Sequence, residues 1–171
     1  KRVATGWEPQ LTIAVDSIVN RATVMELCTE FFRLNPPTRL KLRSETLSGT
    51  LEALTSGQAD LAVGVVMDGS TKTNLQRKPL GTVSFVFAMA PHHPLARLPE
   101  PLSDEDIRQH RAVAIADSNL NGASLTIGLL TGQDVFTVAD MPAKIDAQLR
   151  GLGAGFLPTC LAHSYIDSGR L

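Results

Sequence analysis

The alternation of apolar strands with a helical apolar stripe over residues 11–66 most constrains what this chain can fold into. Residues 11–15 (LTIAV) alternate large with smaller side chains, and residues 39–45 (RLKLRSE) and 59–66 (ADLAVGVV) form two further strand patterns. Residues 22–34 between them carry apolar side chains at helical spacing. That stripe, which we expect to face a core, consists of Val24, Leu27, Cys28 and Phe31. The resulting order of strands and helices favours an α/β fold with a parallel sheet and right-handed crossovers.

The rest of the chain repeats this alternation after a break. Ser48 is a plausible N-cap for a second helix that ends at Gly57. The strand pattern of residues 83–90 is followed by the proline-rich stretch PHHPLARLPEP, where we place a boundary between two lobes. Further elements are expected at residues 111–117, 134–138 and 153–157, with a capping-box start at 103–106 and a helix opened by Asp140 and Pro142.

Composition excludes several functional classes. The chain has 171 residues, is 43% hydrophobic, and carries 16 Lys and Arg against 17 Asp and Glu, which gives a net charge of -1. Because the cationic residues are few and scattered, we do not expect the chain by itself to bind DNA. No stretch reaches the apolar length of a membrane span, so a cytoplasmic location is the default expectation.

Cofactor and metal sites are not expected. Cys28 and Cys160 are expected to be free, buried or half-buried thiols, and no two of the four histidines have the i, i+4 spacing of a helical metal site. The motif GxSxG is absent from the sequence, and GLGAGF follows a predicted helix rather than a strand, which is the wrong context for a dinucleotide fingerprint. We therefore expect a protein that is not an enzyme.

Four stretches, in this order and at this spacing, resemble the effector-binding domain of LysR-type transcriptional regulators. They are GWEPQLTIAVDS, SGTLEALTSGQADLAVGV, KPLGTVSFVFAMAPHHPLA and AKIDAQLRGLGAGFLP, and the resemblance runs through the whole chain. It implies a two-lobe fold of the type 2 periplasmic-binding-protein kind, with a small effector held between the lobes. It also implies the following division: the end of a linker region at 1–10, lobe I at 11–89, lobe II at 90–163, and the start of a return crossover toward lobe I at 164–171, with the rest of that return missing.

The resemblance further implies partners. A winged helix-turn-helix, which this chain lacks, carries the DNA contacts in the family, and the domains pair as homodimers or higher homo-oligomers. Here that pairing would use residues around 22–34 and 142–150. The alternative function is a solute-binding protein of a transporter with the same two-lobe design, and an enzyme on a similar fold is a third possibility.

The same resemblance implies which residues contact the effector. They are Asp16, Ser17, Ile18, Thr46, Leu47, Ser48, Val66 and Met67 from the first lobe, and Asp117, Ser118, Ala139, Asp140 and Met141 from the second. Hydroxyls and backbone amides at helix N-termini suit a polar group on a small ligand. A purely structural alternative is that Ser17, Ser48 and Asp140 cap helices, and the two roles are compatible.

Charge in the predicted rim loops suggests a class of effector. Four of these loops contain an aspartate, while Arg21 is the one cationic side chain in them; the aspartates are Asp16, Asp68, Asp117 and Asp140. An acidic rim disfavours the burial of multiple negative charges. We therefore predict a neutral, cationic, zwitterionic or singly anionic effector, unless the aspartates cap helices and point away from the ligand.

Overall fold

The computed structural model describes residues 6–65, 74–121 and 125–171. The chain forms two compact units: unit 1 contains Lys1–Val66 and Asp117–Leu125, and unit 2 contains Met67–Ala116 and Thr126–Leu171. In this division unit 2 begins at Met67, and Asp117–Leu125 belongs to unit 1 although it lies far along the chain. The family-based division into lobes at 11–89 and 90–163 stays a prediction.

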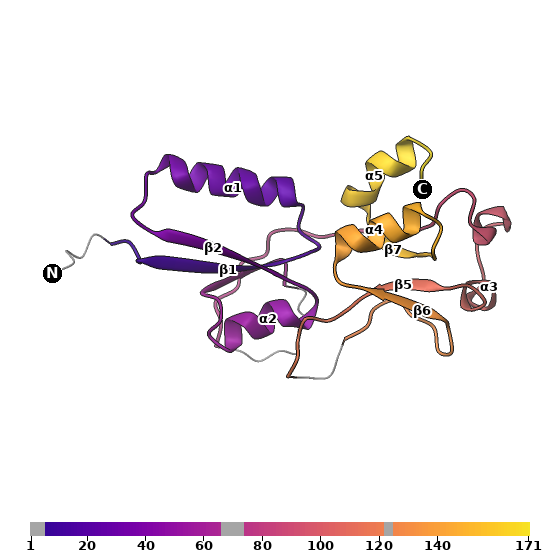
Figure 1. Ribbon diagram of the computed structural model, residues 1–171, viewed down its shortest axis with the longest axis horizontal. Helices are drawn as coiled ribbons and strands as arrows, with labels where there is room; N and C mark the ends of the chain where they lie inside the picture. Colours follow the sequence, from indigo (N-terminus) through magenta and orange to yellow (C-terminus); the bar gives the residue numbers. More distant parts are fainter. Residues whose placement is uncertain (1–5, 66–73, 122–124) are drawn as a thin grey trace. The chain divides into compact units, whose positions relative to one another are not determined.

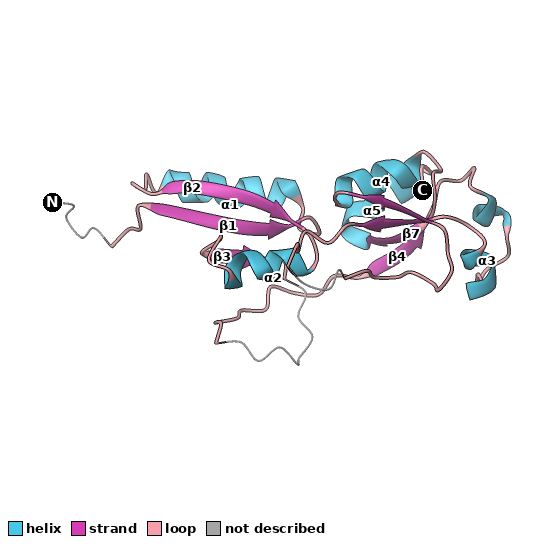
Figure 2. Cartoon of the chain, turned by 60° about the horizontal axis from the view of Figure 1, so that its bottom comes forward, coloured by secondary structure: helices cyan, strands magenta, loops and turns pink. Residues whose placement is uncertain are grey.

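Unit 1 is built on a parallel sheet with strand order β2-β1-β3. Its elements are β1 (Gln10–Asp16), α1 (Arg21–Arg33), β2 (Arg39–Glu45), α2 (Ser48–Thr55) and β3 (Leu61–Val63). Figure 1 shows α1 and α2 on opposite sides of β1 and β2, and Figure 2 shows these two strands side by side. Asp16 pairs with Glu45 in the register, so both strands end at the same level. The parallel α/β arrangement predicted from the sequence is confirmed for this unit.

Two local predictions in unit 1 are wrong. The third strand spans three residues, Leu61–Val63, rather than 59–66, and its first residue Leu61 is 47% exposed. Ser48 is the first residue of α2 rather than its cap; the cap position is held by Leu47, at φ 53° with no side-chain cap bond. The Ser48 hydroxyl is engaged elsewhere, as described below.

The apolar stripe of α1 is only partly covered. Val24 is buried and Cys28 and Phe31 are half-buried, but Leu27 is 60% exposed. Helical periodicity places these side chains on one stripe, but burial also needs an apolar surface opposite each of them. The prediction that the whole stripe faces a core therefore fails at Leu27.

Unit 2 has two pairs of strands and most of the apolar core. Its elements are β4 (Phe85–Ala88), a 3₁₀ turn (Pro94–Arg97), α3 (Asp104–Arg108), β5 (Ala112–Ile115), β6 (Val135–Val138), α4 (Met141–Leu149), β7 (Gly155–Pro158) and α5 (Thr159–Asp167). β4 pairs antiparallel with β7, and β5 pairs parallel with β6. The core consists of Ala88, Met141, Ile145, Leu157 and Ala162, so α4 and α5 pack on β4 and β7.

Helix starts in unit 2 follow the sequence signals. Ser103 caps α3 in a capping box with Asp106, and Asp140 caps α4 by accepting a hydrogen bond from the Ala143 amide.

Both Cys28 and Cys160 are free thiols, the first half-buried and the second exposed. Within the described ranges, every helix is too short or too polar to cross a membrane.

Candidate functional site

The ends of β1 and β2 bring a buried carboxylate next to the start of α2. Asp16 is 6% exposed and accepts hydrogen bonds from the Ile18 amide at 2.9 Å and from the Thr50 hydroxyl at 2.7 Å. Burial raises the pKa of Asp16, while these hydrogen bonds act in the opposite direction. The carboxylate thereby ties the loop after β1 to the first turn of α2.

A second carboxylate occupies the amino end of α2. Asp117 accepts from the Ser48 hydroxyl at 2.6 Å and the Gly49 amide at 3.1 Å, and also from the amides of Asn119 and Leu125. Burial alone would raise the pKa of Asp117, but the four hydrogen bonds together lower it. Asp117 therefore satisfies the helix donors that a ligand anion would otherwise find.

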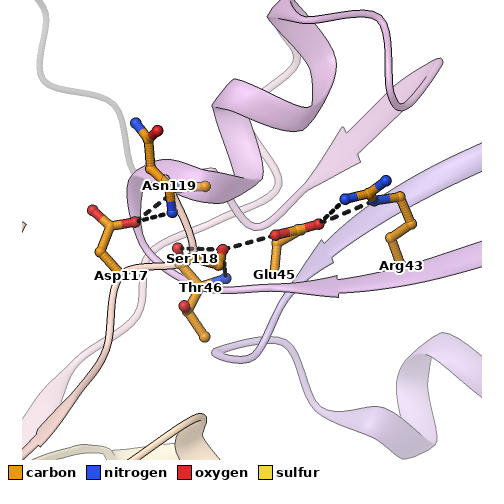
Figure 3. A network of polar contacts seen from close by, with 7 residues as sticks. Arg43, Glu45, Thr46, Asp117, Ser118 and Asn119 are labelled. Carbon is orange, nitrogen blue, oxygen red and sulfur yellow. Dashed lines mark hydrogen bonds and ion pairs between the residues drawn. The ribbon is translucent and has the colours of Figure 1, made fainter. Parts of the chain in front are cut away.

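Ser118 connects this segment to the end of β2 (Figure 3). Its hydroxyl accepts from the Thr46 amide at 2.9 Å and lies 2.7 Å from a Glu45 carboxylate oxygen, to which it donates. The other Glu45 oxygen accepts from Arg43 Nε at 3.0 Å and Nη2 at 2.8 Å. Since Glu45 is 8% exposed, the arginine and the hydroxyl compensate a carboxylate that is largely removed from water.

Gly49 allows these two segments to meet. A Cβ at this position would lie 1.9 Å from Ser118 Oγ, 2.8 Å from the Ser118 carbonyl carbon and 2.9 Å from the Asn119 nitrogen. Any side chain would therefore displace backbone as well as a hydroxyl. We call the set Glu45, Thr46, Ser48, Gly49, Asp117, Ser118 and Asn119 the α2 cluster.

A small cavity borders the α2 cluster. It has a volume of about 100 Å³, and its lining includes Arg43, Glu45, Gly49, Gln58, Ser118 and Leu120. The lining carries both signs of charge, side-chain amides and two apolar side chains, those of Ala53 and Leu120. This mixture suits a few atoms of a polar ligand.

The structure gathers eight of the predicted contact residues in unit 1. They are Asp16, Ser17, Ile18, Thr46, Leu47, Ser48, Asp117 and Ser118. Ala139, Asp140 and Met141 lie in unit 2, where Asp140 caps α4 and Met141 is buried in the core. Val66 and Met67 lie outside the described residues.

The predicted acidic rim has a structural explanation. Asp16, Asp117 and Asp140 each accept hydrogen bonds from their own chain, and Asp68 lies outside the described residues. Asp117 and Asp140 cap helices, as the alternative predicts. Asp16 instead accepts from the Ile18 amide and the Thr50 hydroxyl. The charge preference of the effector stays a prediction.

Sequence reasoning missed several members of the site. Gly49, Thr50 and Asn119 were not singled out, although each contacts an aspartate that was. Arg43 and Glu45 were also missed, although the sequence contains a signal for their ion pair. They lie two residues apart at the end of a strand, and this spacing places both side chains on one face of the sheet.

No metal centre is found in the part of the chain that the structure describes, because no group of three or more His, Cys, Asp or Glu side chains there is arranged to hold an ion.

Known proteins resemble this chain in sequence and in fold. The sequence model of the LysR substrate binding domain matches residues 4–171. The uncharacterized HTH-type transcriptional regulator YeeY of Escherichia coli K12 is 39% identical over 166 residues, covering 97% of this chain and 54% of that protein. The HTH-type transcriptional activator AllS of Klebsiella pneumoniae is 31% identical over 172 residues, covering 100% and 64%. The chain thus spans 54% and 64% of the length of these two curated relatives.

Solved structures agree on the fold. The regulatory domain of MetR, a LysR family regulator from Neisseria meningitidis, has a TM-score of 0.67 at 19% identity and covers 94% of this chain and 74% of that one. The regulatory domain of AphB from Vibrio vulnificus has a TM-score of 0.61 at 20% identity and covers 95% and 81%. These neighbours have the type 2 periplasmic-binding-protein-like fold, as predicted. The chain belongs to the LysR substrate-binding domain family, whose role in transcriptional regulators is to bind an effector.

Proposed function

We propose that this chain senses a small-molecule effector on behalf of a longer DNA-binding regulator, and that the effector contacts the α2 cluster. The observation that carries the proposal is a cavity of about 100 Å³ beside the α2 cluster, whose lining includes the polar residues Arg43, Gln58 and Asn121. Ser17, Ile18 and Leu47 complete the proposed contact set in unit 1. The family match supports the class of function, and the contacts in the α2 cluster support the position.

The wider assembly is proposed from the relatives. The curated relatives are named as HTH-type regulators, so DNA contacts are assigned to a region outside this chain. We propose self-association through α1, since Leu27 and Phe32 are 60% and 56% exposed. A regulator of this kind acts in the cytoplasm, and we assign the chain no catalytic step. The transporter solute-binding alternative is not favoured, because the relatives are transcriptional regulators.

A bulky side chain at position 17 should abolish the response to the effector. Ser17 follows β1, and its amide donates to the Glu45 carbonyl oxygen at 3.0 Å, so an indole there would crowd the loop beside the α2 cluster. For a ligand at about 100 times its Kd, linkage predicts about 2.7 kcal/mol of stabilisation, or about 5–10 °C in Tm. Thermal-shift assays of wild type and Ser17→Trp against amino acids, monocarboxylates, aromatic acids and citrate would measure this difference.

The matched control is Ser56→Trp, at the exposed end of α2 away from the proposed contacts. It should keep the wild-type ligand shift. If Ser17→Trp folds and still gains the full shift, the site is misplaced, whereas stabilisation of wild type by citrate alone would contradict the predicted effector class.

A further inference from the structure

Three histidines gather in unit 2 around the 3₁₀ turn Pro94–Arg97. His93 caps this turn: its ring is buried, and Nδ1 accepts a hydrogen bond from the Leu95 amide at 3.2 Å. An accepting Nδ1 carries no proton, so the ring in this position is the neutral form, protonated only at Nε2. His110, just after α3, packs edge-on against His93 with ring centroids 5.5 Å apart.

This contact joins three segments of unit 2. The turn buries Leu95, which is 2% exposed, and the His93 carbonyl accepts from the Ala96 amide. The carbonyl oxygens of Ile107 and His110 both accept from Gln133 Nε2 at 3.0 Å, which ties the end of α3 to the loop before β6. The His93–His110 ring contact joins the turn to this assembly.

We propose that His93 and His110 form an acid-sensitive joint, in which protonation of His93 breaks the cap on Leu95 and releases the turn Pro94–Arg97 from the end of α3. A protonated Nδ1 can no longer accept from the Leu95 amide, so the cap is lost when the charge arrives. The charge also enters a buried position with little water to solvate it.

The side chains around His93 do not stabilise a positive charge on its ring. The titratable side chains that act on it are His110, from the end of α3, and the adjacent His92, and both are cationic when protonated. Within the described residues, no carboxylate lies within ion-pair distance of the His93 ring; the one histidine with such a partner is His163, beside Asp167. Arg97 belongs to the same turn and is exposed.

The direction of the pH dependence follows from these surroundings. Burial lowers the pKa of His93 below its ordinary value of 6.5, and His110 and His92 lower it further. The opened form therefore binds more protons than the closed form at pH values below 6.5. The joint has its full stability above that pH and loses stability as the pH falls.

Amide exchange tests the joint directly. In the full chain, protection of the Leu95 and Ala96 amides, corrected for intrinsic rates, should fall as the pH is lowered from 7.5 to 5, by up to about tenfold per pH unit below 6.5. His93→Asn keeps a side-chain oxygen for the cap but does not titrate, so its protection should change by less than about twofold. His163→Asn, which removes an exposed histidine, should behave as wild type.

Two results would overturn the joint: acid-insensitive protection in wild type, or the same acid loss in His93→Asn. Should His93→Asn fail to fold, His110→Asn decides the matter. His110→Asn removes a group that lowers the pKa of His93, so that pKa should rise in the closed form and protection should fall by a smaller factor between pH 7.5 and 5. An unchanged profile would contradict the pairing. The proposal concerns unit 2 and does not depend on the effector site.

Discussion

Replacing Lys144 with methionine should raise the free energy of unfolding and remove a rise in stability at alkaline pH. Lys144 is 7% exposed, and its amine has no ion-pair partner among the described residues. Gly155 leaves room for it, since a Cβ there would lie 3.3 Å from Lys144 Nζ. Methionine fills a similar volume without the charge.

The size of the effect follows from the pKa. Burial lowers the pKa of Lys144 from 10.5 to about 8. Below pH 8 the folded protein carries a buried cation, at a cost of up to about 3 kcal/mol. Between pH 8 and 10.5 the unfolded chain binds more protons, so stability rises with pH through this window in wild type and not in Lys144→Met.

Urea denaturation at pH 7 and pH 10 would measure both effects, read as a change in midpoint at constant m. Lys41→Met is the control, because Lys41 is exposed on β2 and its loss should change stability by no more than about 0.5 kcal/mol. A Lys144→Met protein that is less stable at pH 7 and keeps the wild-type rise would show that the amine has a stabilising partner in solution.

Gln148, one helical turn from Lys144, is a second polar side chain on the buried face of α4. Gln148 is fully buried, and its amide nitrogen donates to the carbonyl oxygens of Ala88 and Gly155 at 2.6 and 3.1 Å. Its Oε1 has no hydrogen-bond partner within the described residues. Lys144 and Gln148 lie one turn apart on α4, so this helix packs two polar side chains against the strands rather than a purely apolar stripe.

Local sequence signals predicted the elements well because their causes are local. β1 and β2 follow period-two alternation, and their observed ends lie within one residue of the predicted ones. The starts of α3 and α4 are set by Ser103 and Asp140, whose capping bonds reach only three residues along the chain. Such contacts are visible in any short window of the sequence.

The α2 cluster depends on contacts that no short window contains. Asp117 lies 68 residues from Gly49, yet its carboxylate caps the helix that Ser48 was expected to cap. The family resemblance placed Ser48 and Asp117 in a ligand site, but only the structure shows that these two side chains are hydrogen-bonded to each other. The positive φ of Leu47 likewise has no sequence signal, since leucine rarely adopts this conformation.

Replacing Gly49 with alanine should destabilise unit 1 by about 2–4 kcal/mol, through overpacking and the loss of buried hydrogen bonds. Helix propensity predicts the opposite sign, because alanine in place of glycine inside a helix gains about 0.5–1 kcal/mol. The added methyl group would collide with Ser118 Oγ and with two backbone atoms. Displacing them breaks the bonds that hold Asp117 and Ser118 to α2.

A double-mutant cycle with Ser118→Ala separates the two sources of the clash. Removing the hydroxyl relieves the 1.9 Å contact but leaves the Ser118 carbonyl carbon at 2.8 Å and the Asn119 nitrogen at 2.9 Å. The double variant should therefore remain at least as unstable as Ser118→Ala alone.

Thr55→Ala, at the exposed end of α2, controls for changes within the helix and should stay within about 0.5 kcal/mol of wild type. If Gly49→Ala stabilises the protein as propensity predicts, residues 117–119 do not rest on α2 in solution, and the α2 cluster is not the site.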